Sequence, residues 1–222
     1  VADEEHSSIG AEALVKDFQC DAAIVCEPTD MKVAVGHKGF EWVEITTEGV
    51  AAHGSRPDDG VDAIVLMGRV LRGVEELDAR MPVHPLLGRA SIHASLISGG
   101  RELSTYPDRC VLRLERRTLP GETGADVVAE VRRACEAVRG RQPQLAVEVS
   151  LLTAQGPSDV STDAPIVQAL ERSLREQGET VRVSGMSAWT DAALLNAAGI
   201  PAICFGPGDI SLAHAAEEYI PL

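Results

Sequence analysis

Between residues 40 and 151 the chain carries the alternation that most restricts its possible folds. Strand-like and helical segments follow one another in the order strand, helix, strand, strand, helix, strand. The segments are residues 40–47, 62–79, 91–97, 110–116, 125–139 and 145–151. This order is the split βαβ pattern of a ferredoxin-like sandwich. We therefore predict a complete α+β domain over residues 38–154.

Helices and short apolar strands flank this domain on both sides. Before it, residues 8–18 have helical spacing, and residues 22–26 (AAIVC) are a continuous apolar run, typical of a strand buried on both faces of a parallel sheet. The segments after it are helical at 163–177 and 191–198 and strand-like at 181–183 and 201–205. Residues 1–37 and 155–222 are therefore predicted to form one α/β domain, which the ferredoxin-like domain interrupts.

The composition excludes several classes of partner. With 222 residues and 45% hydrophobic side chains, the chain has enough material for a buried core. A net charge of −14 argues against nucleic acid, which is bound through Lys and Arg, and gives no attraction to an anionic membrane surface. No apolar run approaches the roughly 18 residues needed to span a bilayer, and no charged-then-apolar leader begins the chain. We predict a protein that binds neither nucleic acid nor membrane.

The cysteines indicate a reducing compartment. There are five, with no C-x-x-C pair among them: Cys20, Cys26, Cys110, Cys135 and Cys204. An odd, scattered set inside apolar segments is typical of reduced core thiols. We therefore expect a cytoplasmic protein.

Polar residues at three predicted strand ends indicate a candidate site. Ligands of open α/β sheets gather outside the carboxyl ends of the strands. Glu5, Glu27 and His214 are of the ligand types that zinc accepts. Neighbouring strand residues point to opposite faces, so a turn would let Glu5 bind a metal while Glu4 faces the reacting water as a general base. An acidic pair at a strand end is also typical of a helix N-cap or a solvated turn, and His214 could be a surface residue.

Several longer motifs occur in one order along the chain. They are VADEEHSSIG, CEPTD, GVAAHGSRPDDGVDAI, ERRTLPGE, GIPAICFGPG and AHAAEEYIP. Together they resemble the family of zinc-dependent aminoacylases and exopeptidases that includes acetylornithine deacetylase, succinyl-diaminopimelate desuccinylase and glutamate carboxypeptidases. The resemblance implies an α/β zinc-hydrolase catalytic domain, incomplete at both ends, with an inserted ferredoxin-like domain that acts as lid and forms a homodimer.

The resemblance also implies roles for the residues of the site. Glu4 matches the general base, Glu5 and His214 match ligands of one zinc, and Glu27 matches the carboxylate ligand of a second zinc. His53, in AAHGS, matches the histidine that reaches into the partner subunit's active site and stabilises the oxyanion of the tetrahedral intermediate. From the residues alone, His53 would instead be interpreted as a loop histidine beside Gly54.

Three further positions match substrate-binding parts of the family. Arg117 matches the arginine that binds the substrate's carboxylate, a task suited to a guanidinium group, although an exposed strand arginine would look the same. The backbone of Gly206 and Gly208 is expected to line the substrate pocket. Ser104 stands where many family members have an asparagine that contacts substrate, so the substrate could differ.

The family's H-x-D motif and bridging aspartate lie upstream of the DEE segment, where this sequence begins. The sequence also stops at IPL, where relatives continue into another helix. The chain is therefore interpreted as an internal fragment that lacks one zinc's histidine and the bridging carboxylate, and is inactive by itself.

The predicted function of the parent protein is hydrolysis of the amide bond of an N-acyl amino acid or small peptide with a free carboxylate, through a water activated by two zinc ions. Cobalt or manganese would suit the same ligands. An N-carbamoyl amino acid hydrolase or a dipeptidase would use the same residues, and a non-catalytic dimerisation or binding module is an alternative of a different class.

Overall fold

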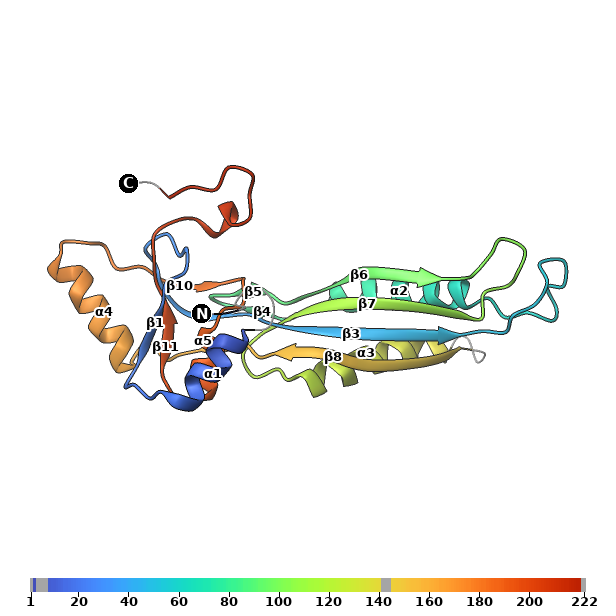
Figure 1. Ribbon diagram of the computed structural model, residues 1–222, viewed down its shortest axis with the longest axis horizontal. Helices are drawn as coiled ribbons and strands as arrows, with labels where there is room; N and C mark the ends of the chain where they lie inside the picture. Colours follow the sequence, from blue (N-terminus) through green and yellow to red (C-terminus); the bar gives the residue numbers. More distant parts are fainter. Residues whose placement is uncertain (1, 3–7, 141–144, 221–222) are drawn as a thin grey trace. The chain divides into compact units, whose positions relative to one another are not determined.

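The computed structural model describes residues 2, 8–140 and 145–220, and the chain divides into two compact units (Figure 1). Unit 1 consists of Val1–Gly39, His84–Gly88 and Pro157–Leu222, and unit 2 consists of Phe40–Val83 and Arg89–Gly156. The assignment of a catalytic role to the first and a lid role to the second stays a prediction.

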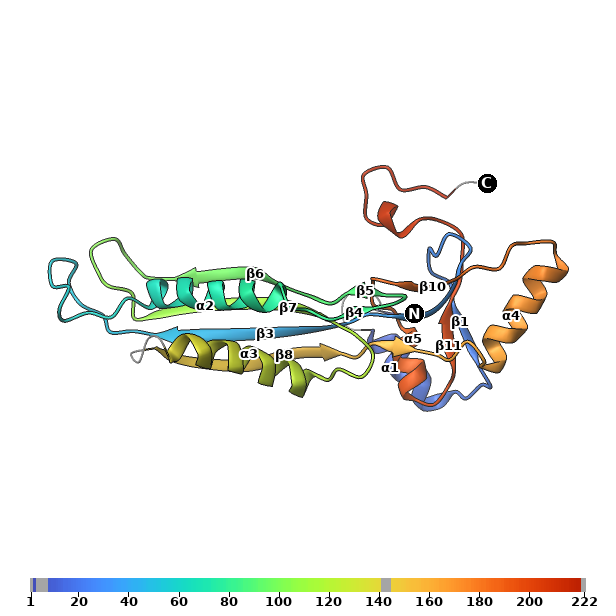
Figure 2. The same ribbon diagram turned by 180° about the vertical axis from the view of Figure 1, so that it is seen from behind.

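Unit 2 is a four-stranded sheet with two helices. Its elements in chain order are β3 (Gly39–Glu48), α2 (Ala63–Asp78), β6 (Ser91–Gly99), β7 (Arg109–Thr118), α3 (Gly124–Arg139) and β8 (Ala146–Gln155). The strands lie in the order β6-β7-β3-β8, and both β6–β7 and β3–β8 are antiparallel. Figures 1 and 2 show α2 and α3 on the same face of this sheet. The predicted ferredoxin-like topology is confirmed.

The alternation of side chains along β7 explains why the helices cover only one face. Cys110, Leu112 and Leu114 are buried beneath the helices, whereas Arg113 between them is exposed on the opposite face. From α2, a row of apolar side chains at helical spacing packs into the same core: Leu66, Met67, Val70, Val74 and Leu77. The apolar side chains of the strand repeat every two residues and those of the helix about every 3.6 residues, and both sets therefore lie in the same buried layer.

Both helices of unit 2 begin at side-chain caps. The Asp62 carboxylate accepts a hydrogen bond from the Val65 N–H at 2.9 Å. Thr123 and Asp126 form a reciprocal capping box at the start of α3. These contacts satisfy amide groups that have no partner inside the helix. None of the helices in the part of the chain that the structure describes combines the length and the apolar character needed to cross a membrane.

Unit 1 is built on a mixed sheet. Its elements are α1 (Ile9–Asp17), β1 (Ala23–Val25), β2 (Val33–His37), β9 (Ser158–Asp159), α4 (Pro165–Glu176), β10 (Val183–Met186), α5 (Ala192–Ala197), β11 (Ala202–Cys204) and a 3₁₀ turn, η1 (Ile210–Leu212). The strands lie in the order β1-β11-β2-β10, with β9 also paired to β2. β1 is parallel to β11 and β2 is parallel to β10, whereas β11 and β2 are antiparallel. The helices and strands expected on both flanks are present.

Strand β2 is the main element that the sequence did not predict, together with β9 and the short pair β4 (Val83–His84) and β5 (Gly88–Arg89). All five residues of β2 are buried at the centre of the sheet. A glycine near its end obscured the strand pattern. A Cβ on Gly36 would lie 2.6 Å from the Ser158 carbonyl oxygen, so the close approach of β9 requires glycine there.

Two expectations about burial were wrong. Strand β1 lies at an end of the described sheet, and Ile24 is 42% exposed. The cysteines are free thiols, but only Cys110, Cys135 and Cys204 are buried. Cys20 and Cys26 are exposed, because each lies in a connecting segment just outside β1 and not in an apolar element.

Each unit buries a titratable side chain whose pKa shift shows a cost of burial. In unit 2, burial raises the pKa of Glu41 from 4.5 to about 7, against the Thr118 hydrogen bond and the nearby Arg116, which both lower it. In unit 1, burial lowers the pKa of His37 from 6.5 to about 4. Within the described residues, Glu41 Oε2 and His37 Nε2 have no hydrogen-bond partner.

Replacing Glu41 with glutamine is expected to stabilise the chain relative to wild type as the pH rises from about 4.5 to 7. In that range the unfolded wild type releases a proton that the folded state keeps, so wild-type stability falls with rising pH and the variant's does not. The difference should approach about 3 kcal/mol. Urea unfolding at half-unit pH intervals measures it.

His37→Gln is the control, because its stability difference from wild type should change with pH in the opposite direction. Between pH 4 and 6.5 the unfolded state binds a proton that folded His37 does not, so wild-type stability falls as the pH falls. The advantage of this variant should therefore grow toward acid, whereas that of Glu41→Gln shrinks. Parallel pH profiles for the two variants would contradict both assignments.

Candidate functional site

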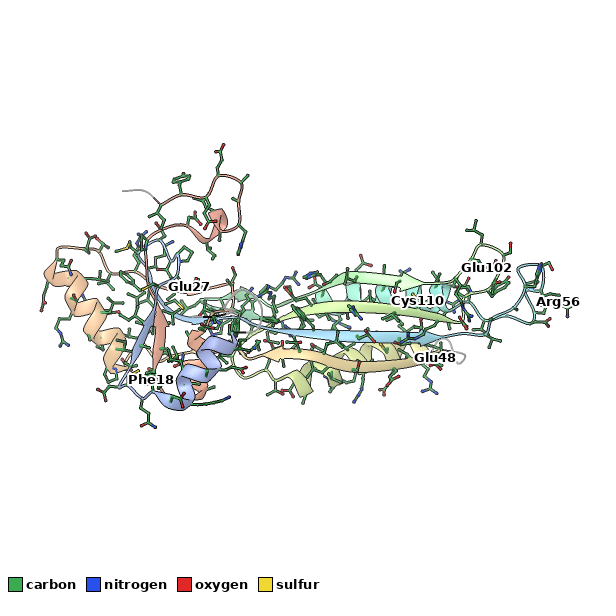
Figure 3. The ribbon with its side chains drawn as sticks, in the orientation of Figure 1. Phe18, Glu27, Glu48, Arg56, Glu102 and Cys110 are labelled. Atoms are coloured by element: carbon green, nitrogen blue, oxygen red, sulfur yellow. The ribbon has the colours of Figure 1, made fainter. Side chains whose placement is uncertain are left out.

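The predicted metal ligand Glu27 lies beside a cavity in unit 1. The cavity has a volume of about 280 Å³ and is lined by Cys26, Glu27 and Pro28 after β1 and by the segment from Gly206 onward after β11. β1 and β11 are parallel neighbours, so both loops leave the same edge of the sheet. Figure 3 shows Glu27 at this end of β1. The cavity therefore lies where the sequence predicted a site, outside the carboxyl ends of two strands.

Hydrogen bonds hold the two loops of this cavity together. The Gly206 N–H donates to Thr29 Oγ1 at 3.1 Å, and the Gly206 carbonyl accepts from the Thr29 N–H at 3.2 Å and from the Met31 N–H at 3.0 Å. The Asp30 N–H donates to the Gly208 carbonyl at 2.8 Å. We call these contacts the Thr29–Gly206 clasp. They fix the backbone on which Glu27 is carried.

The predicted pocket glycines are required by their backbone surroundings. A Cβ on Gly206 would lie 2.7 Å from the Glu27 carbonyl oxygen. Gly208 has φ of 95°, a conformation that residues with a side chain rarely adopt. Both residues line the cavity, so this part of the prediction agrees with where the structure puts them, while their contact with substrate stays a prediction.

His214 lies in the same segment of unit 1, beyond η1. Its backbone has φ of 61°, and its N–H donates to the Glu218 carboxylate at 3.2 Å. Glu218 and the neighbouring Ala213 line the cavity that contains Glu27. The left-handed backbone at His214 is uncommon for a residue other than glycine and is typical of functional loops.

The described residues do not by themselves make up a metal site. Carboxylates from Glu27, Asp209 and Glu218 line the cavity, but no group of three or more His, Cys, Asp or Glu able to hold a metal occurs within the described ranges. Burial raises the pKa of the Cys204 thiol, at the end of β11, to about 12. Glu4 and Glu5 lie outside the described residues. The predicted ligand set stays a prediction.

In unit 2, the loops of the predicted residues His53 and Ser104 lie together. His53 forms an isolated antiparallel bridge with Thr105, and the Gly54 N–H donates to the Ser104 carbonyl at 2.6 Å. The Ser55 N–H donates to His53 Nδ1 at 3.2 Å. Because Nδ1 accepts this hydrogen bond, the neutral imidazole carries its proton on Nε2. His53 can therefore donate a hydrogen bond from Nε2.

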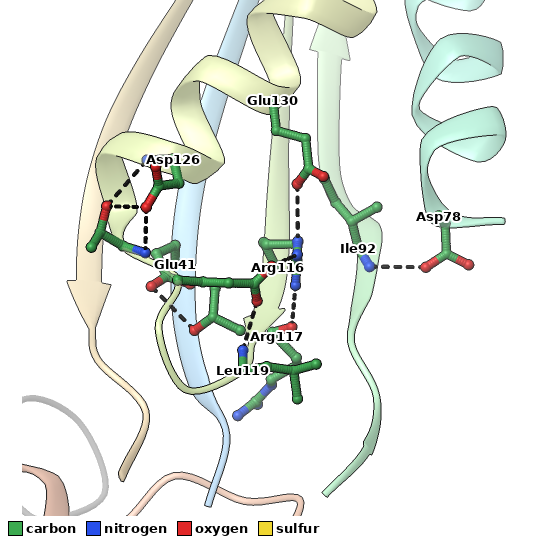
Figure 4. Close-up of polar contacts among 11 residues, drawn as sticks. Glu41, Asp78, Ile92, Arg116, Arg117, Leu119, Asp126 and Glu130 are labelled. Carbon is green, nitrogen blue, oxygen red and sulfur yellow. Dashed lines mark hydrogen bonds and ion pairs between the residues drawn. The ribbon is translucent and has the colours of Figure 1, made fainter. Parts of the chain in front are cut away.

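The side chains of the adjacent residues Arg116 and Arg117 make different contacts, and Figure 4 shows those of Arg116. Arg116 is fully buried on the helix side of β7, where Nε donates to Glu130 at 3.4 Å, Nη2 donates to Glu122 at 2.6 Å and Nη1 donates to the Arg117 carbonyl. Arg117 points to the opposite face, where Nε donates to Glu115 at 2.6 Å. The Arg117 guanidinium carbon lies 5.5 Å from the centroid of the Phe40 ring.

The two predicted sites of unit 2 lie at opposite ends of its sheet. Arg117 is the last but one residue of β7, beside the start of β3, whereas His53 follows the other end of β3. With a rise of about 3.3 Å per residue, the ten residues of β3 separate these ends by roughly 30 Å. Figure 3 shows Arg56 and Glu102, from the loops of His53 and Ser104, together at the far end of unit 2. One copy of unit 2 therefore does not bring His53 and Arg117 together.

Sequence reasoning missed the partners that orient the predicted residues. Glu115 and Phe40 hold Arg117, and Thr29 holds the Glu27 loop. A signal for Glu115 was present, since residues two apart on a strand share a face. Phe40 and Thr29 are joined to their partners only by strand pairing and loop packing, which the sequence does not reveal.

Comparisons with known proteins agree with this architecture. Residues 35–142 match the peptidase dimerisation domain model of the M20 family. The chain is 29% identical over 230 residues to the acetylornithine deacetylase of Myxococcus xanthus, covering 100% of this chain and 59% of that protein. It is 31% identical over 232 residues to the acetylornithine deacetylase of Klebsiella pneumoniae (strain 342), covering 99% of this chain and 57% of that protein.

A solved structure has the same fold. Aminopeptidase PepT from Bacillus cereus ATCC 10987 superposes with a TM-score of 0.74 at 20% identity, covering 92% of this chain and 54% of that chain. The chain spans somewhat more than half the length of the relatives that it matches. The predicted family resemblance and fold class are thereby confirmed.

Proposed function

We propose that the whole protein is a metal-dependent amidohydrolase of the M20 family, whose dimerisation domain model matches residues 35–142. Its substrate is an N-acyl amino acid or small peptide with a free carboxylate. The observation that carries this proposal is the cavity at which Glu27 and the Gly206–Gly208 backbone meet, at the carboxyl ends of two parallel strands. The relatives named acetylornithine deacetylase support amide hydrolysis as the reaction class.

In this proposal, Glu27 is a ligand of one zinc ion, and Glu5 and His214 are ligands of a second. Zinc, when bound, supplies a water of lowered pKa and a Lewis acid for the scissile carbonyl. Cobalt or manganese would serve the same ligands. Glu4 accepts the proton from the attacking water and passes it to the leaving amine. The Gly206–Gly208 backbone lines the substrate pocket.

The two ends of unit 2 take different parts in the reaction. His53 donates a hydrogen bond from Nε2 to the oxyanion, and Arg117 binds the substrate carboxylate. Their separation by the length of β3 supports the proposal that His53 serves the partner subunit's active site in a homodimer. The match of residues 35–142 to a dimerisation domain supports the same assembly. Ser104, whose loop pairs with that of His53, lies next to the substrate in this arrangement.

The free thiols of the described chain are those that a reducing compartment maintains, so we place the enzyme in the cytoplasm. An N-carbamoyl amino acid hydrolase or a dipeptidase would use the same residues and differ in the shape of the pocket. A non-catalytic dimerisation module would keep the fold of unit 2 without needing a metal.

The test is hydrolysis by the whole protein of N-acetyl, N-succinyl and N-carbamoyl amino acids and dipeptides, each as free acid and as carboxamide. We expect one class to be hydrolysed, with a preference for the free acid of about tenfold or more, because a charge-assisted hydrogen bond is worth about 1.5–3 kcal/mol. Chelation should abolish the activity and added zinc should restore it.

Metal analysis of the same preparation separates the alternatives. If the protein holds metal and hydrolyses N-carbamoyl substrates best, it is an N-carbamoyl amino acid hydrolase. If it holds metal and hydrolyses dipeptides best, it is a dipeptidase. A protein that binds no metal and hydrolyses no member of the panel would favour the dimerisation module.

A further inference from the structure

Arg117 is held on two sides by neighbours on the face of the unit 2 sheet opposite the helices. Its Nε–H donates to Glu115 Oε1 at 2.6 Å, and the guanidinium group lies over the Phe40 ring at 5.5 Å. Glu115 is two residues before Arg117 on β7, and Phe40 is the second residue of the neighbouring strand β3. One edge and one face of the guanidinium group are therefore occupied.

Trp42 fixes the other half of the same cluster. Its indole Nε1–H donates to Glu115 Oε2 at 3.2 Å, so both oxygens of the Glu115 carboxylate are used. The Trp42 ring also packs against the Phe40 ring, with centroids 5.4 Å apart. The contacts run from Trp42 to Glu115, to Arg117, to Phe40 and back to Trp42, and this closed arrangement restricts the rotation of the Arg117 side chain.

The contacts leave one part of Arg117 available. Its two terminal nitrogens, Nη1 and Nη2, make no hydrogen bond to the residues that the structure describes, and the side chain is 32% exposed. Arg116 differs, because all three of its nitrogens donate within unit 2. The terminal edge of a guanidinium group offers two parallel donors to a carboxylate. Arg117 thus presents this edge while its other edge and one face are held.

We propose that Glu115 is a positioning residue that, with Phe40 and Trp42, orients Arg117 so that its terminal edge binds the substrate carboxylate. This inference rests on the proposed function, in which Arg117 binds that carboxylate. Glu115 does not touch the substrate. It acts through the guanidinium group, and Trp42 acts through Glu115.

The arrangement predicts a separation of kcat from KM. Removing the charge of Glu115 leaves Arg117 positive, so its attraction for the substrate carboxylate persists and KM changes little. Glutamine has one acceptor oxygen where glutamate has two, however, so it cannot accept from both Arg117 Nε and Trp42 Nε1. The guanidinium group is then held less firmly, and the substrate is bound with its amide displaced from the reactive geometry. A displacement of about 1 Å can cost about a hundredfold in rate.

The experiment compares Glu115→Gln with Glu44→Gln in the whole protein, using the best substrate as free acid and as carboxamide. Glu44 is the matched control, because it accepts a hydrogen bond from Arg113 at 2.9 Å on the same face of the same two strands. We expect Glu115→Gln to lower kcat for the free acid by at least about tenfold with KM within about threefold of wild type. Glu44→Gln should leave both constants unchanged.

Two further variants keep the outcomes distinct. Trp42→Phe removes the donor to Glu115 and keeps a ring, so it should lower kcat in the same direction by less. Arg117→Ala should abolish the preference for the free acid. If Arg117→Ala keeps that preference, the proposed role of Arg117 fails. If Arg117→Ala removes it while Glu115→Gln behaves as wild type, or lowers kcat equally for acid and carboxamide, only the positioning role is overturned.

Discussion

Replacing Arg116 with leucine is expected to destabilise the chain by about 3 kcal/mol, with unit 2 as the part that unfolds first. The Arg116 side chain has no exposed surface and donates to Glu122 at 2.6 Å and to Glu130 at 3.4 Å. Removing one partner of a buried ion pair costs about 3–5 kcal/mol, because the remaining charges lose their compensation. Glu122 and Glu130 keep about a quarter of their side chains exposed, so water can solvate them in part. We therefore expect a loss of stability at the lower end of the range for a buried ion pair.

The loss extends to the turn before α3. Glu122 also accepts a hydrogen bond from the Leu119 N–H at 2.7 Å, and Arg116 donates to the Arg117 carbonyl. Without Arg116, the carboxylates of Glu122 and Glu41 face each other with less positive charge nearby, which further disfavours the ionised form of Glu41. The destabilisation should therefore be larger at pH 8 than at pH 5.

Urea unfolding at pH 5 and pH 8 measures this effect. Arg113→Leu is the control, because Arg113 pairs with Glu44 on the exposed face and a surface ion pair is worth at most about 1 kcal/mol. Equal losses for the two variants would mean that burial of Arg116 does not govern its contribution. A loss for Arg116→Leu that does not change with pH would contradict its coupling to Glu41.

Periodicity alone predicted most helices and strands of both units. The order of elements was enough for the ferredoxin-like topology of unit 2, because short connections leave few ways to pair four strands. Strand β2 was not predicted, because the chain near Gly36 and Gly39 lacks a strand-like alternation. In the structure, β2 is the buried centre of its sheet. Its burial depends on neighbours from distant parts of the sequence, β10 and β11. Local pattern carries no information about such neighbours.

The sequence indicated candidate residues for the site but not the contacts that hold them. The resemblance of the motifs to the hydrolase family pointed to Glu27, Gly206 and Arg117, whose roles stay predictions, and each of them lies in a loop or near a strand end. The sequence shows two adjacent arginines. It does not reveal that all three side-chain nitrogens of Arg116 donate hydrogen bonds within unit 2, whereas the terminal nitrogens of Arg117 are available to a ligand. That difference follows from which face of β7 the helices cover. The Thr29–Gly206 clasp joins residues 177 positions apart and could not be inferred from either segment.

Replacing Gly206 with alanine is expected to lower the hydrolytic activity of the whole protein by about a hundredfold. The new Cβ would lie 2.7 Å from the Glu27 carbonyl oxygen, a backbone atom that cannot move without moving the Glu27 loop. The same shift lengthens the hydrogen bonds of the clasp, in which Thr29 both donates to and accepts from Gly206. Overpacking of this kind costs about 1–3 kcal/mol of stability.

Gly156→Ala is the control, because a Cβ at Gly156 would meet no atom within 4 Å. Thr29→Val tests the clasp without adding a clash, since valine keeps the shape of threonine and removes the hydroxyl. It should lower the activity in the same direction but by less than Gly206→Ala, and both should reduce the metal content measured after dialysis. Changes in the partners that hold a metal ligand typically cost about 10–100-fold in metal affinity.

The combination of readouts identifies what the clasp does. If Gly206→Ala loses activity and metal while the midpoint of urea unfolding falls only slightly, the clasp positions Glu27 for its ligand role. If activity and stability fall together and metal is retained by the folded fraction, Gly206 contributes to the fold of unit 1 alone. Full activity and full metal content in Gly206→Ala would show that the Glu27 loop tolerates displacement. A metal ligand on this loop would not tolerate it, so the proposed site would then need a ligand other than Glu27.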